Sequence, residues 1–138
     1  MVAALVELAG SDDYRDRADA GRALASFAEL PEAREPLVRR VLDRRDTFVT
    51  LVTAEALLRR KDLVGFAIVA QALASADDQY SHYIEQAAGT VFMVYASERE
   101  QAMEACDALA LDAGALVREG AAELREMLAK VQPILYPA

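Results

Sequence analysis

Side chains able to carry reactive or metal-binding chemistry are few in this chain of 138 residues. There is one histidine, His82, and one cysteine, Cys106. On a helix, His82 would have Glu85 or Gln86 one turn away, a pairing that could hold a metal ion or transfer a proton. One histidine with one or two carboxylates is a poor metal site, however. We therefore expect a solvated surface histidine and no bound metal.

Cys106 lacks the surroundings of a reactive thiol. No basic residue stands beside it in "MEACDALAL", and it shares an apolar stripe with Met103 and Leu109. We expect it to be a buried small hydrophobic residue. The sequence also lacks a glycine-rich phosphate loop, zinc-ligand spacing and a nucleophile elbow. It therefore predicts a protein that is not an enzyme and uses no cofactor.

Composition and charge narrow the class of partner. Hydrophobic residues make up 54% of the chain, which is enough for one domain over residues 1–138. The net charge of −8 disfavours nucleic acid and anionic membranes and favours another protein, in particular a basic one. The opening "MVAALVELAG" lacks the basic start of a signal peptide and is too short to span a bilayer. With a lone cysteine, these features predict a cytoplasmic protein.

A segment built from small residues recurs along the chain. It is first seen as "DRADAGRALASFAE" (16–29), and similar windows start at residues 49, 83 and 116. One column of these windows holds a large apolar residue at spacings of 33, 34 and 33, namely Leu24, Leu57, Val91 and Leu124. One turn earlier stand Ala20, Thr53, Ala87 and Gly120. We interpret the small residues as positions where neighbouring helices approach closely.

Each window follows a second helical pattern, at 2–9, 36–43, 64–74 and 98–111. The chain is therefore predicted to be all-α, with helical hairpins at about 1–30, 34–62, 63–96 and 97–131 and a tail at 132–138. Units of this length must stack on one another to bury their apolar faces. A four-helix bundle with accidental self-similarity is the alternative.

The joints between helices carry their own signals. Between the two helices of successive units, an aspartate is placed to cap the second helix or favour its positive end: Asp13, Asp46, Asp78 and Asp112. Between units, Pro31 and Pro36 are expected to bracket one break, "RRKD" to form another, and "YASERE" the third, with Ser97 as the N-cap.

The windows "DRADAGRALASF" and "VTLVTAEALLRR" resemble the second helix of HEAT repeats, in particular the short bacterial HEAT-like type. The resemblance covers roughly residues 1–131. It implies a right-handed α-solenoid of about four two-helix repeats whose second helices line a concave, protein-binding surface. The later units depart from the pattern, with Thr90 and Val91 or Glu123 and Leu124 in place of "AL", and the arginine early in the helix survives only as Arg17. The fourth unit is thus expected to be a less regular cap.

A rotation of about 100° per residue identifies the side chains opposite the buried column. Phe48, Val52 and Met93 are predicted to form an apolar strip there, with charged residues at its rim. The alternative is that the second helix of unit two, which is apolar nearly all round, is enclosed by its neighbours. The predicted partner-binding residues are Arg15, Asp19, Arg22, Phe48, Val52, Glu55, Arg59, His82, Gln86 and Met93.

The function favoured by these observations is a non-catalytic adaptor or inhibitor, such as an immunity protein that neutralises a toxin. A HEAT-like enzyme, either a DNA glycosylase or a chromophore lyase, is one alternative, and a self-associating module or homodimer is another. A glycosylase would need a basic groove and aromatic residues for an extruded base. Two smaller expectations are that Tyr80, Tyr83 and Tyr95 pack between layers and that the tail packs on the last unit through Ile134, Leu135 and Tyr136.

Overall fold

The structure, a computed structural model, describes residues 1–112 and 114–136. The described residues are all-helical apart from loops and one isolated bridge, which confirms the predicted all-α class. The elements in chain order are α1 (Val2–Leu8), α2 (Tyr14–Leu24), the 3-10 turn η1 (Ala25–Phe27), α3 (Pro31–Val41), α4 (Thr47–Arg59), α5 (Leu63–Ala74), α6 (Asp78–Phe92), α7 (Ala96–Asp112) and α8 (Ala115–Lys130). None of these helices has the length and apolar character needed to cross a membrane.

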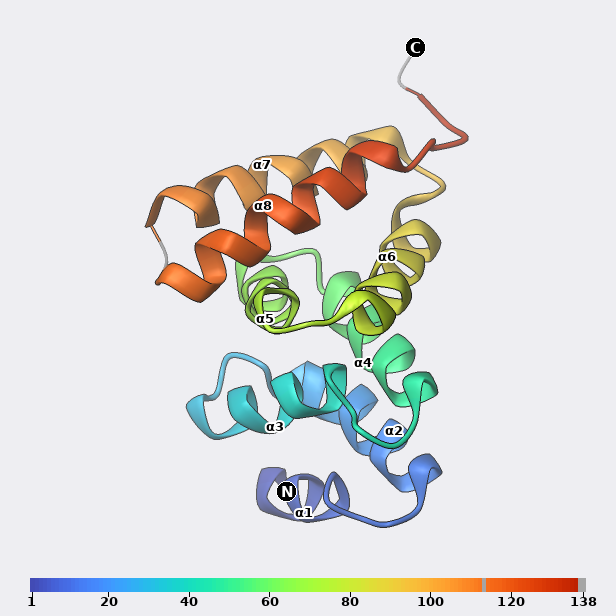
Figure 1. Cartoon of the computed structure of the whole chain (residues 1–138), viewed down its shortest axis with the longest axis vertical. Helices are drawn as coiled ribbons and strands as arrows, with labels where there is room; N and C mark the ends of the chain where they lie inside the picture. Colours follow the sequence, from blue (N-terminus) through green and yellow to red (C-terminus); the bar gives the residue numbers. More distant parts are fainter. Residues whose placement is uncertain (113, 137–138) are drawn as a thin grey trace.

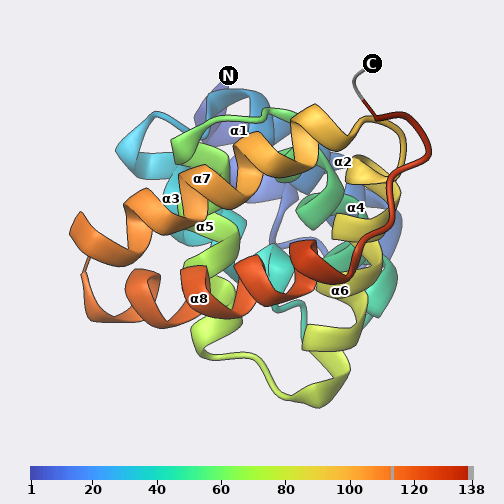
Figure 2. The same cartoon turned by 90° about the horizontal axis from the view of Figure 1, so that it is seen from above.

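The helices are arranged as hairpins that follow one another from the N-terminal to the C-terminal end of the molecule (Figure 1). Along one side, α2 packs on α4 and α4 packs on α6, while α1, α3 and α5 form a second row. Helix α4 therefore lies between α2 and α6. The α7–α8 hairpin covers the far end of both rows (Figures 1 and 2).

Aspartate side chains begin four of the helices, largely as the sequence predicts. Asp13 accepts a hydrogen bond from the backbone N–H of Arg15, and Asp46 accepts one from that of Phe48. In α6 the N-cap is Asp77, and Asp78 lies in the first turn, where its charge favours the positive end of the helix, the second of the two roles predicted for it. Helix α5 has a cap that the sequence analysis did not assign, namely Asp62. The prediction for Asp112 concerns a side chain outside the described part of the chain.

The helices break close to all three predicted places, but at two of them the residues involved differ from the prediction. Helix α3 starts at Pro31, where the fixed φ of proline suits a first helical residue, and Pro36 lies inside it. Ser97 does not cap α7 because the helix already begins at Ala96. The break after α4 occurs at Lys61, whose φ of 55° is left-handed and stops the helix before Asp62 caps the next one.

The predicted column of large apolar residues is buried at all four positions: Leu24, Leu57, Val91 and Leu124. The small residues one turn earlier are buried too, and the chain uses them for close helix contacts. Gly21, the residue after Ala20, faces Thr53 of this column: a Cβ at Gly21 would lie 2.2 Å from Oγ1 of Thr53, so the glycine makes room for α4 against α2. The idea that small residues permit close approach therefore holds here.

An internal ion pair joins the first two hairpins. Arg17, the arginine singled out by the HEAT-like pattern, is buried and holds both carboxylate oxygens of Asp43, at 3.0 and 3.2 Å. The same guanidinium donates to the backbone carbonyls of Ser11 and Asp12. Asp43 in turn accepts the backbone N–H of Arg45 and Asp46. This network fixes the α1–α2 loop against the α3–α4 turn.

The last hairpin, α7–α8, does not stack on the preceding hairpin in the way that the earlier hairpins stack on one another. Helix α8 packs mainly across α5 and only lightly against α6. At the crossing, Gly120 lies against the backbone of Ala70, and a Cβ there would stand 1.6 Å from the Ala70 carbonyl oxygen. Figure 2 shows α7 and α8 running obliquely over α5. The expectation of a less regular fourth unit agrees with this arrangement.

The tail packs on the molecule, but through its backbone. The N–H groups of Ile134 and Leu135 donate to the carbonyls of Met93 and Val94, and the N–H of Ala96 donates to the carbonyl of Leu135. Tyr95 and Leu135 form an isolated parallel bridge. The side chains of Ile134, Leu135 and Tyr136 remain exposed, so the prediction that they bury themselves on the last unit is wrong.

Candidate partner-binding face

Two aromatic side chains meet on the outer surface of α2 and α4. The rings of Tyr14 and Phe48 are edge to face, with centroids 6.0 Å apart and an interplanar angle of 83°. Each follows an aspartate N-cap, Asp13 or Asp46, so each is held in the first turn of its helix. Tyr14 is 44% exposed and Phe48 is 43% exposed. The pair is therefore fixed by local structure but open to a partner.

A cation stands beside this aromatic pair. The guanidinium carbon of Arg15 lies 6.0 Å from the centre of the Tyr14 ring, at the outer limit of a cation–π contact. The same side chain forms an exposed ion pair with Asp13, with Nη2 and Oδ2 2.9 Å apart. The hydrogen bond from Arg15 lowers the pKa of Asp13, and the carboxylate raises the pKa of Arg15. Both groups are therefore charged at neutral pH.

Of the three residues predicted to form the apolar strip, Phe48, Val52 and Met93, only Val52 is buried. Val52 is only 8% exposed and packs with Ala18 and Val49 in the seam between α2 and α4. The rotation argument placed Val52 opposite the core without knowing that α2 and α6 would flank α4 on both sides. The prediction that Val52 contacts a partner is therefore wrong for this conformation.

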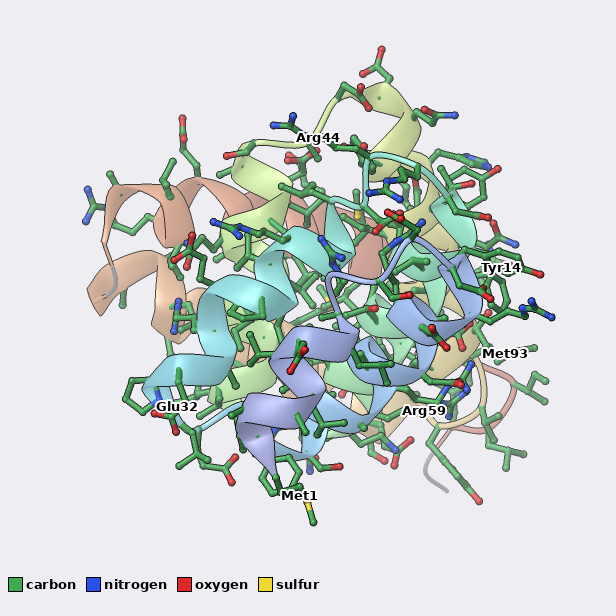
Figure 3. The ribbon with its side chains drawn as sticks, turned by 90° about the horizontal axis from the view of Figure 1, so that it is seen from below. Met1, Tyr14, Glu32, Arg44, Arg59 and Met93 are labelled. Atoms are coloured by element: carbon green, nitrogen blue, oxygen red, sulfur yellow. The ribbon has the colours of Figure 1, made fainter. Side chains whose placement is uncertain are left out.

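Most of the other predicted partner-binding residues are exposed on α2, α4 and α6. Glu55 is half-buried, and Arg22 forms a surface ion pair with Asp19, with 3.3 Å between their atoms. Figure 3 shows Tyr14, Met93 and Arg59 on the same side of the molecule. The exposed members of the predicted set are Arg15, Asp19, Arg22, Phe48, Arg59, His82, Gln86 and Met93. We call the Tyr14–Phe48 pair together with these residues the α2–α4–α6 face.

The residues first considered for chemistry lie apart from one another. His82 is exposed, and its ring stands edge to face with that of Tyr83 at 5.2 Å. Within the part of the chain that the structure describes, no group of three or more His, Cys, Asp or Glu side chains could hold a metal ion. Cys106 is buried, and that burial raises the pKa of its thiol to about 12. A thiol in this state is a poor nucleophile.

The tyrosines of the third unit have different environments. The hydroxyl of Tyr80 donates to the backbone carbonyl of Asp43 at 2.9 Å, which joins α6 to the α3–α4 turn. Burial raises the pKa of this hydroxyl. Tyr83 is half-buried, whereas Tyr95 is half-exposed on the bridge to the tail. The expectation of packing between layers is therefore confirmed for Tyr80 and wrong for Tyr95.

Sequence reasoning missed Tyr14, although a signal for it exists. Tyr14 directly follows the N-cap Asp13 in "DDYR", and Phe48 follows the N-cap Asp46 by two residues in "DTFV". Aligning the two helix starts would have placed both aromatic residues in the first turns of their helices, one position apart. Met93 was predicted by the rotation argument, but the exposed side chains of Val94, Tyr95 and residues 134–136 carried no such signal, since their exposure depends on the bridge to the tail.

Comparisons with known proteins add little to this picture. No protein-family model matches the chain, and no curated protein matches it significantly. Among solved structures, an engineered protein known from a crystal structure is similar over 97% of this chain, with 21% identity and a TM-score of 0.37. The alignment covers 65% of that engineered protein. At this TM-score the likeness supports no conclusion about fold or function.

Proposed function

We propose that this chain is a non-catalytic protein-binding module that holds its partner on the α2–α4–α6 face. In this proposal the stacked hairpins form a short right-handed solenoid of the HEAT-like type, with α7–α8 as an irregular cap. The observation that carries it is the half-exposed Tyr14–Phe48 pair, held in place by two helix caps and accompanied by Arg15.

The chemistry of this pair is that of an interface anchor. Tyr and Arg are among the residues enriched where most binding energy concentrates, and fixed aromatic rings lose little conformational entropy when they are covered. The residues around the pair include charges of both signs, among them Asp19, Arg22 and Arg59, as is usual at the polar rim of an interface. We therefore place the centre of the contact at Tyr14 and Phe48.

The charge of the chain suggests the class of partner. A net charge of −8 would speed encounters with a basic protein and slow encounters with nucleic acid. An adaptor or an inhibitor of a basic protein fits both this charge and the anchor. The partner we propose is therefore a basic protein that presents an apolar side chain to the aromatic pair.

The test starts from a partner that is captured with the wild-type chain, identified by mass spectrometry and then purified. Its affinity is measured by calorimetry for wild type, Phe48→Glu and a matched control, Leu116→Glu. Phe48 and Leu116 are similarly exposed, but Leu116 lies on α8. We expect Phe48→Glu to weaken binding by at least about thirtyfold, equivalent to about 2 kcal/mol, because a charge must be desolvated at the anchor. Leu116→Glu should bind as wild type does.

Arg59→Glu gives a graded readout, because it reverses one rim charge and should weaken binding only modestly. Far-ultraviolet circular dichroism must be unchanged for all three variants. Equal affinities for Phe48→Glu and Leu116→Glu would contradict the proposal. So would light scattering that shows a wild-type dimer and a monomeric Phe48→Glu, because the face would then join two copies of this chain.

A further inference from the structure

A pocket of about 750 Å³ opens beside the α3–α4 turn, and five of its eleven lining residues are arginine. It lies where this turn meets the start of α2, the end of α5 and the first turn of α6. Ser75 and Tyr80 close it on the side of α5 and α6. A smaller hollow of about 420 Å³, which shares Arg44, Arg45 and Tyr80 with it, continues around the turn. The arginines that line the pocket are Arg17, Arg39, Arg40, Arg44 and Arg45.

Asp43, the one acidic residue that lines the larger pocket, does not balance these arginines, and Asp46, which lines the smaller hollow, caps α4. Asp43 is buried, both of its oxygens bind Arg17, and one also accepts two backbone N–H groups. Its charge is thus largely neutralised by Arg17. Arg39 and Arg45 do have acidic partners, Glu35 and Asp12, but these pairs lie in solvent and are weak. The pocket therefore has an excess of positive charge.

Two of the arginines have donors without acceptors. Arg40 is only 16% exposed, and its buried Nε has no hydrogen-bond partner, although another nitrogen donates to the carbonyl of Ala9 and lies 3.7 Å from Asp43. Burial lowers the pKa of Arg40, the charge of Asp43 opposes this, and repulsion from neighbouring arginines such as Arg17 adds to the lowering. Arg44 is exposed at the mouth and makes no hydrogen bond or ion pair within the described residues.

We propose that this arginine pocket binds a phosphate group, either as the free ion or as part of a small phosphate ester. A phosphate carries close to two negative charges and several acceptor oxygens, and guanidinium groups bind it with paired hydrogen bonds. The volume is that of a small-molecule site. Arg44 at the mouth is the residue that binds the ion directly, and Arg39 and Arg40 supply the wall behind it.

The position of the pocket separates it from the α2–α4–α6 face. Figure 3 shows Arg44 at the end of the molecule where the turn lies, away from Met93 and Arg59. The first 62 residues hold eleven of the fifteen Lys and Arg residues and twelve of the 23 Asp and Glu residues, a net charge of −1, whereas the remaining residues have a net charge of −7. The arginines of the pocket therefore lie in the less acidic part of the chain.

The test measures binding of inorganic phosphate, pyrophosphate and adenosine monophosphate by calorimetry at constant ionic strength, with chloride as the balancing ion. Wild type is compared with Arg44→Gln and with Arg59→Gln, its matched control. Both arginines are exposed, and neither has an ion-pair partner among the described residues. Arg44→Gln should weaken phosphate binding by about tenfold, as expected when one charge-assisted hydrogen bond is lost. Arg59→Gln should leave it unchanged.

The arms of the experiment distinguish the form in which phosphate is bound. Tighter binding of adenosine monophosphate than of inorganic phosphate supports an ester, and equal binding supports the free ion. Amide resonances of residues 39–45 should shift on titration in wild type and much less in Arg44→Gln. The proposal is overturned if none of the three probes binds at millimolar concentration, or if Arg44→Gln and Arg59→Gln lower the affinity equally.

Discussion

The first two hairpins and the last one are joined to their neighbours by different means. Between the first two, arginines of the second hairpin reach back to the ends of earlier helices: Arg40 donates to the carbonyl of Ala9 and Arg60 to that of Ala25. Ala9 and Ala25 are the C-caps of α1 and α2, whose last carbonyls lack partners within the helix. The last hairpin is joined instead by direct backbone approach at Gly120.

This difference explains why the hairpins stack in two ways. Arginine side chains that bind specific carbonyls and Asp43 fix both the distance and the direction between consecutive hairpins. A glycine contact between α8 and α5 fixes only the closeness of two helices at one point. The α7–α8 hairpin is therefore free to adopt the crossing that packs best, and it lies across α5 instead of following α6.

The largest loss of stability is expected when the polar network around Arg17 and Asp43, in the first half of the chain, is broken. Asp43→Ala leaves Arg17 buried without its carboxylate and removes the acceptor for two backbone N–H groups. Removing one partner of a buried ion pair typically costs about 3–5 kcal/mol. Urea denaturation should show a loss of this size in the free energy of unfolding.

The double variant Arg17→Met with Asp43→Leu is the matched control for that prediction. It removes both charges and keeps apolar bulk, so it should recover a large part of the loss. A double variant no more stable than Asp43→Ala would mean that the ion pair itself does not account for the effect.

The second largest loss of stability is expected at the backbone contact between Gly120 in α8 and Ala70 in α5. Gly120→Ala places a methyl group 1.6 Å from the Ala70 carbonyl oxygen, and backbone atoms cannot move aside as side chains do. Overpacking of this kind costs about 1–3 kcal/mol or more, and α8 should shift away from α5. Thermal unfolding and the hydrogen exchange of amides in α5 and α8 would show both results.

Two other glycines serve as controls for Gly120→Ala. Gly21→Ala meets the side chain of Thr53, which can change its rotamer, so its cost should be smaller. Gly89→Ala meets nothing within 4 Å and lies in α6, so it should raise stability by about 0.4–1 kcal/mol. If all three variants lost the same stability, the special role given to Gly120 would be wrong.

The helices and the buried column of large apolar residues could be predicted from the sequence because both depend on local periodicity. Leu57 is buried, as its place in the repeat requires. Pro36 was misassigned because a proline in a second helical turn is tolerated when packing compensates, and periodicity cannot report that. Val52 and the crossing of α8 depend on which helices stand beside a given one, which is a property of the assembled chain. The arginine pocket is formed by segments that are far apart in the sequence, so no local pattern could predict it.

A third, smaller effect appears at high pH and contrasts the thiol buried in the last hairpin with the ion pair buried in the first half. Burial, with a lesser contribution from the charge of Asp107, raises the pKa of the Cys106 thiol to about 12. The unfolded chain releases this proton from about pH 8.5 upward, while the folded chain keeps it, so stability falls as pH rises. Between pH 8 and pH 10 the loss should be about 2 kcal/mol.

The comparison that isolates this thiol uses Cys106→Ala. Urea denaturation at pH 8 and pH 10 should show a smaller decrease in stability for Cys106→Ala than for wild type, whatever the absolute stabilities. Identical decreases would show that other groups cause the alkaline loss. They would also mean that the thiol is not held neutral by the core of the last hairpin.

The smallest effect tests whether any surface charge helps to hold the last hairpin. Lys61, at the turn before α5, and Glu98, in the first turn of α7, form an exposed ion pair with Nζ and Oε2 2.8 Å apart. Exposed pairs contribute about 0.2–1 kcal/mol, and salt screens them.

Glu98→Gln should therefore lower stability by less than about 1 kcal/mol at low salt and by less still at 1 M salt. Glu104→Gln, at an exposed position on the same helix with no ion-pair partner among the residues that the structure describes, should have no such salt dependence. A double-mutant cycle with Lys61→Gln then separates the pair from the favourable effect of an acid near a helix start. A coupling energy well above 1 kcal/mol would mean that charge, and not the contact of Gly120 with α5, sets where the last hairpin lies.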